Sequence, residues 1–118
     1  MYTDQVTTSD GDLFAFGYPT TISVADLESK VATQATEWHR CDGEPMEKEA
    51  FRGGGSEGIF AVYRCGSTPV LRWVGVHGGF GLFVGLILKP FVDTQDAIAR
   101  FKERIAALTW GPRAASMP

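Results

Sequence analysis

The stretch from Thr68 to Phe91 constrains the fold more than any other part of this chain. It contains no acidic residue, and glycine recurs in it every few positions. Apolar side chains continue on both sides of His77-Gly78-Gly79, and a Gly-Gly pair suits the positive φ angles of a tight hairpin turn. The stretch therefore predicts two adjacent antiparallel strands at the centre of a small sheet.

The same stretch does not predict a membrane span. Only the sixteen residues from Trp73 to Leu88 separate the charges of Arg72 and Lys89, whereas a membrane-spanning helix needs about 20 apolar residues. A length of 118 residues indicates a single domain, residues 1–118.

Two cysteines and a polar N-terminus predict a cytosolic protein. The first twelve residues lack both the basic and the apolar segment of a secretory leader. A single pair of cysteines, Cys41 and Cys65, does not make a disulfide framework. We therefore expect a reducing compartment, with both thiols free.

Capping residues and apolar spacing predict the other elements. Ser23 is a suitable N-cap for a first helix that ends near His39–Cys41, and Asp93 or Thr94 begins a second helix that Gly111-Pro112 stops. An irregular tail follows over residues 111–118. The expected strands are Leu13–Tyr18, Gly58–Cys65, Val70–Val76 and Phe80–Lys89.

This order, β-α-β-β-β-α, predicts an α+β fold. The expected architecture has two layers, an antiparallel four-stranded sheet and two helices packed on one of its faces. On the second helix, Asp96 and Arg100 have the i,i+4 spacing of a surface ion pair.

Charge divides unevenly between the two halves of the chain. Residues 1–57 hold eleven acidic and four basic side chains (−7), and residues 58–118 hold three acidic and seven basic ones (+4), which together give the net −3. Such a division can serve a charged protein partner, self-association or pairing within the chain. It disfavours nucleic-acid binding, which needs a concentrated basic surface.

The histidines and cysteines are few enough to consider together. His39, Cys41, Cys65 and His77 could supply four zinc ligands, but Cys65 and His77 stand alone at separate strand ends, without the paired spacing of structural zinc sites. A Cys65–His77 nucleophile pair would depend on the strand register. Packing and surface roles explain these residues more simply, so we predict neither a metal nor another cofactor.

Six side chains are candidates for a ligand site or an interface. Because side chains alternate along a strand, Trp73 and His77 share one face, and Arg72 lies on the other. The last strand is apolar on both faces, so a two-layer domain would leave a large apolar face bare. A second copy, a ligand or a terminal segment could cover it. The candidates are Trp38, Tyr63, Arg72, Trp73, His77 and Phe83.

Two functions from different classes remain open. The first is a small non-enzymatic interaction protein that acts as a homo-oligomer through its apolar sheet face, with its acidic first half available to a protein partner. The alternative is a small-ligand-binding domain or small enzyme with an apolar pocket between the curved sheet and the first helix.

Overall fold

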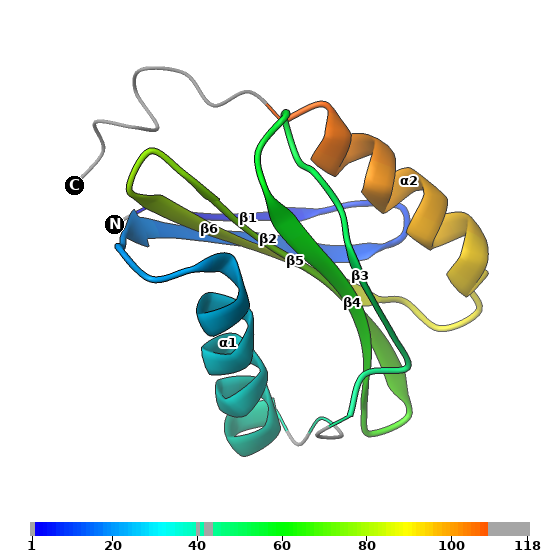
Figure 1. Ribbon diagram of the computed structural model, residues 1–118. Helices are drawn as coiled ribbons and strands as arrows, with labels where there is room; N and C mark the ends of the chain where they lie inside the picture. Colours follow the sequence, from blue (N-terminus) through cyan, green and yellow to red (C-terminus); the bar gives the residue numbers. More distant parts are fainter. Residues whose placement is uncertain (1, 40, 42–43, 109–118) are drawn as a thin grey trace.

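A six-stranded antiparallel sheet lies between two helices (Figure 1). The computed structural model describes residues 2–39, 41 and 44–108. The strands lie in the order β1-β2-β6-β5-β4-β3, so the sheet begins and ends with strands that are short or polar. The elements are β1 Tyr2–Thr7, β2 Gly11–Pro19, α1 Val24–His39, β3 Glu47–Ala50, β4 Gly58–Cys65, β5 Thr68–His77, β6 Phe80–Leu88 and α2 Thr94–Ala106.

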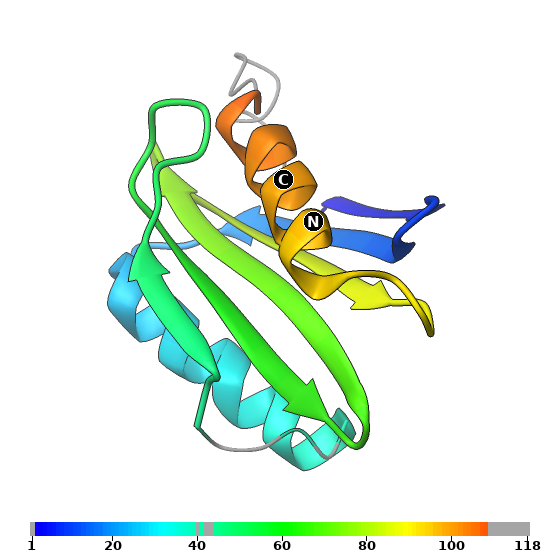
Figure 2. The same cartoon turned by 90° about the vertical axis from the view of Figure 1, so that its right-hand side faces the viewer.

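The two helices pack on opposite faces of the sheet, so the two-layer prediction is wrong. Figure 2 shows α2 in front of the sheet and α1 behind it. Helix α2 buries Ile98 and Phe101 against Trp73 and its neighbours, whereas α1 buries Leu27 against Val74 on the other face. The central strands are apolar on both sides, and each side therefore requires its own cover.

The α+β class, the antiparallel sheet and the two helices are confirmed, but the sheet has six strands instead of four. The two unpredicted strands lie at its edges, and neither shows an apolar alternation. Strand β1 pairs along its whole length with β2, and β3, whose four side chains are all exposed, pairs with β4. Such edge strands are held in the sheet by main-chain hydrogen bonds, which leave no pattern in the side chains from which the strand could be predicted.

The helix starts and the hairpins follow the local signals in the sequence. The Ser23 hydroxyl accepts a hydrogen bond from the Asp26 N–H at 3.1 Å, and the Asp93 carboxylate accepts one from the Asp96 N–H at 2.9 Å. At the turn between β5 and β6, Gly78 and Gly79 have φ angles of 55° and 79°, which glycine adopts without strain. The predicted stop at Gly111-Pro112 and the tail over 111–118 lie outside the described residues.

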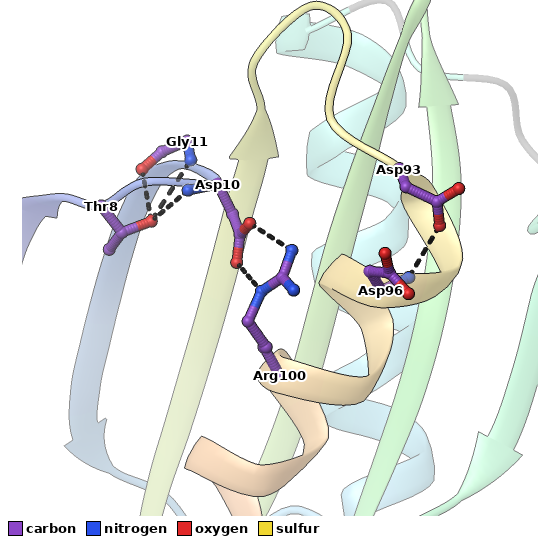
Figure 3. A network of polar contacts seen from close by, with 6 residues as sticks. All are labelled: Thr8, Asp10, Gly11, Asp93, Asp96 and Arg100. Carbon is purple, nitrogen blue, oxygen red and sulfur yellow. Dashed lines mark hydrogen bonds and ion pairs between the residues drawn. The ribbon is translucent and has the colours of Figure 1, made fainter.

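A bidentate ion pair ties α2 to the turn between β1 and β2 (Figure 3). Arg100 donates from Nε and Nη2 to the Asp10 carboxylate at 2.8 and 2.6 Å. The Thr8 hydroxyl orders this turn by accepting hydrogen bonds from the N–H groups of Asp10 and Gly11. The guanidinium that the i,i+4 spacing assigned to Asp96 thus engages a carboxylate 90 residues away in the chain.

Cys41 and Cys65 form a disulfide, which corrects the prediction of free thiols. The bond joins the segment after α1 to the end of β4 and closes a loop of 24 residues in sequence separation. The predicted cytosolic location rested in part on free thiols, and disulfides persist mainly in oxidising compartments, so the bond removes that support. The location itself stays a prediction. Among the described residues, neither helix is long and apolar enough to cross a membrane.

We expect Asp10→Asn to lower the melting temperature by a few degrees at neutral pH and to lose this effect in acid. The hydrogen bonds from Arg100 hold the pKa of Asp10 below its ordinary value. The pair therefore stabilises the fold above the unfolded pKa of about 3.9, and this stability is lost as the pH falls through the folded pKa. Thermal unfolding from pH 7 to pH 2 measures the difference. The control Asp12→Asn alters an exposed carboxylate nearby. Its melting temperature should not differ from that of the wild type by an amount that shrinks as the pH falls.

We expect thiol titration of the denatured, unreduced protein to find no free cysteine, and to find both after reduction. Cys65→Ser should lower the free energy of unfolding by about 3 kcal/mol, because the loop closure no longer restricts the unfolded chain. Cys41→Ser and the double variant should lose the same amount, since each removes the same bond. Two reactive thiols in the unreduced protein would contradict the disulfide.

Candidate interaction surface

An apolar surface lies on the part of the sheet that α1 leaves uncovered. We call it the half-sheet surface and define it by Phe14 and Phe16 of β2 and Phe83 and Ile87 of β6. The three rings form one cluster, with centroids 5.5 to 6.0 Å apart. Phe16 and Ile87 are 39% and 41% exposed, and Phe14 and Phe83 are half-buried.

The width of the sheet explains why this surface stays open. Helix α1 packs on β4 and β5, and a helix about 10 Å across spans only about two strands at a spacing of about 4.8 Å. Strands β2 and β1 therefore extend beyond it, together with the part of β6 that lies past Gly81 and Phe83, where Leu27 and its neighbours reach the sheet. Gly85 makes room for the Phe14 ring, because a Cβ at position 85 would come within 2.4 Å of that ring.

A buried polar cluster borders the half-sheet surface under α1. Glu28 of α1 accepts hydrogen bonds from the Tyr63 hydroxyl at 3.0 Å and from Arg72 Nη2 at 3.4 Å. The Arg72 guanidinium also stacks on the Tyr63 ring, with Cζ 3.8 Å from the centroid. Lys48 pairs with the second Glu28 oxygen at 3.1 Å. The side chains of Glu28 and Arg72 are each 3% exposed, so their charges are removed from water together.

Burial dominates the electrostatics of this cluster. It raises the pKa of Tyr63 to about 12, although the charge of Arg72 acts in the opposite direction. It also lowers the pKa of Arg72, against the opposing effects of Tyr63 and Glu28. The Arg72 Nε is buried and has no hydrogen-bond partner among the described residues. The cluster is therefore a charged structural contact whose hydrogen bonding is incomplete.

Trp73 lies on the opposite face from this cluster. Its ring is fully buried in the core under α2, and its Nε1 donates to the Phe51 carbonyl oxygen at 2.8 Å. Gly58 and Gly75 make room for the ring, since a Cβ would come within 2.4 Å of it at position 58 and within 2.0 Å at position 75. Trp73 is thus a core residue, and it does not join Arg72 in a site.

His77 lies at the exposed end of β5. Its Nδ1 is 2.8 Å from the Ser56 hydroxyl, which belongs to the glycine-rich loop between β3 and β4. Ser56 is 8% exposed, and its backbone is held by reciprocal hydrogen bonds with Gly53. The contact anchors this loop to the end of β5.

Cys41, Cys65 and His77 do not form a metal centre in the described part of the chain. The two cysteines bond to each other, and His77 is at the opposite end of β5 from the strand end paired with Cys65. No three histidine, cysteine or acidic side chains among the described residues gather as ligands. The disulfide also removes Cys65 as a nucleophile for His77. The side chains of His39 and Trp38 lie outside the described part of the structure.

Acidic side chains of the first half of the chain form ion pairs with basic side chains of the second half. Within the part of the chain that the structure describes, three ion pairs join an acid of the first half to a base of the second half: Asp10–Arg100, Glu28–Arg72 and Glu49–Lys102. This agrees with the simplest of the three explanations, internal complementarity. It leaves fewer acidic side chains available to a protein partner.

Solved structures share this arrangement of sheet and helices. One is PA94 from Pseudomonas aeruginosa, a protein of unknown function for which a regulatory role has been suggested. It matches 94% of this chain and 83% of its own length at a TM-score of 0.64 and 10% identity. The solution structure of the cyanobacterial PsbP (CyanoP) of Synechocystis matches 88% of this chain and 78% of its own length, with a TM-score of 0.59 and 13% identity.

These similarities define the class of fold, an antiparallel sheet between two helices, and at such identities they define the fold alone. No family model matches the sequence. No curated protein matches it either. The function must therefore be argued from the surfaces of this chain.

Part of the candidate surface could be named from the sequence. The prediction included Tyr63, Arg72 and Phe83, and the structure brings Tyr63 and Arg72 into contact. The sequence analysis did not name Glu28, Phe14 or Phe16. The alternation of Phe14, Phe16 and Tyr18 was a usable signal, but the partner strand β6 could be identified only from the tertiary pairing.

We expect Glu28→Leu to lower the free energy of unfolding by about 3–5 kcal/mol, because it leaves the buried Arg72 charge without its carboxylate. The double variant Glu28→Leu/Arg72→Met should be more stable than Glu28→Leu alone, since it removes both buried charges. Urea unfolding of the two variants and of Arg72→Met completes the comparison. Additive losses would show that the two side chains do not depend on each other.

Proposed function

We propose that this protein is a non-enzymatic interaction protein that acts as a homo-oligomer, with the half-sheet surface as the contact between copies. The observation that carries the proposal is the cluster of Phe14, Phe16, Phe83 and Ile87 on β2 and β6, at the margin of the area that α1 covers. Contiguous apolar side chains that are exposed or half-buried on a small domain are typical of an interface.

The chemistry of the surface favours a second copy as its occupant. A two-fold contact places the same surface of each copy against the other, so any charge at its centre meets a like charge. The four defining side chains are uncharged, and such a contact therefore brings no repulsion between them. Burial of apolar area from both copies supplies the driving force.

The alternative of a ligand pocket between the sheet and α1 has less support. Leu27 and Val74 fill that interface and have no exposed area, and Glu28 is 2% exposed. A ligand pocket needs concave space with a few polar groups directed into it. Here Glu28, Tyr63 and Arg72 bond to one another.

We expect the wild-type protein to sediment as a multiple of its 12.8 kDa chain mass at tens of micromolar. Phe16→Lys and Ile87→Lys should each shift it to the monomer, because each would bury an unpaired charge in the contact. Analytical ultracentrifugation measures the mass, and circular dichroism checks that the variants are folded.

Met46→Lys is the matched control, since Met46 is 52% exposed and lies outside the half-sheet surface. It should leave the oligomer intact. A wild-type protein that stays monomeric at millimolar concentration would refute the proposed contact. An oligomer that is insensitive to both half-sheet substitutions would place the contact elsewhere.

A further inference from the structure

Phe91 combines two properties that the fold itself does not explain. Its side chain is fully exposed, at 105% of the reference area, and its backbone is left-handed, with a φ of 68°. It follows Pro90 in the connection between β6 and α2. A proline followed by a residue with positive φ is the arrangement of a type II turn, in which glycine or asparagine normally takes the second position.

The two ends of this turn are held firmly. The Lys89 N–H donates to the Asp10 carbonyl oxygen at 2.9 Å, and Asp93 caps α2. The Asp10–Arg100 ion pair joins the two anchoring elements, and Figure 3 shows the connection arching from the end of β6 to Asp93. Phe91 is therefore presented in a strained conformation, while its ring contributes no buried area to the fold.

We propose that Phe91 is the anchor of a second contact, in which it enters an apolar pocket bordered by lysine or arginine side chains on a different protein. An exposed aromatic ring on a fixed turn pays little conformational entropy on binding, as is typical of residues that dominate an interface. This inference does not depend on the half-sheet surface, whose defining residues are Phe14, Phe16, Phe83 and Ile87.

The charges around the turn select the chemistry of the partner. Exposed Asp12, Asp93 and Asp96 are placed around it with exposed Lys89 and Arg104, which leaves a net charge of −1, and the charges of Asp10 and Arg100 cancel each other. Basic side chains at the rim of a pocket complement this surface. The same acidic groups oppose insertion of Phe91 into an anionic membrane, so a protein is favoured over a lipid surface.

The stability of Phe91→Gly is the first test. Glycine adopts the left-handed conformation without strain, and the variant loses no buried contact, so its melting temperature should equal or exceed that of the wild type. A clear fall in melting temperature would show that Phe91 supports the fold, and it would overturn the inference.

Photo-crosslinking is the second test, with p-benzoylphenylalanine in place of Phe91 in the full chain expressed in its source cells. Position 46 carries the same group as the exposed control. The inference is supported by a cross-link specific to position 91 that maps to an apolar segment flanked by lysine or arginine and weakens in Asp93→Asn/Asp96→Asn. Asparagine keeps the helix cap while it removes the charge.

Each remaining outcome of the cross-linking overturns the inference. A yield no higher than at position 46 would mean that nothing binds the ring. A cross-link to lipid would identify a membrane contact, and one to a second copy of this chain would assign Phe91 to the oligomer. A cross-link that is unchanged in Asp93→Asn/Asp96→Asn would show that basic side chains of the partner do not recognise this surface.

Discussion

The width of the sheet relative to its helices is the constraint on which the rest of this structure depends. Six strands present two broad faces, and the chain supplies one helix of 16 residues and one of 13 to cover them. With both helices on one face, the other face of the strongly apolar β5 and β6 would be left in water. One helix on each face protects the central strands, and the margin on the α1 face becomes the half-sheet surface.

The local features of the fold could be predicted from the sequence because local chemistry determines them. Ser23 and Asp93 cap the two helices, and Gly78-Gly79 forms the central hairpin turn, as their residue types indicate. The two edge strands could not be predicted, because main-chain pairing holds them and their side chains show no apolar alternation. The placement of the helices was also inaccessible, since a strand that is apolar on both sides fits either arrangement.

The candidate site shows the same division between local and long-range information. Alternation along β5 separates Arg72 from Trp73 correctly, but it does not reveal which of the two faces holds a polar cluster. That depends on Glu28, a charged residue of α1 that the fold buries. The disulfide could not be predicted for a related reason, because the pairing of Cys41 with Cys65 depends on where the chain returns after α1.

The pairing of β2 with β6 also sets an order of assembly. Strands β4, β5 and β6 follow one another along the chain and pair through short turns, whereas β2 must find a strand about 70 residues further on, Gly11 opposite Leu88 and Pro19 opposite Phe80. Contacts of such long sequence separation form late, because loop closure opposes them. We therefore expect the β4–β5–β6 meander to form first and the β1–β2 hairpin to dock last. The aromatic rings of β2 would then reach Phe83 only when folding is almost complete, so a partly folded chain would not yet carry the half-sheet surface.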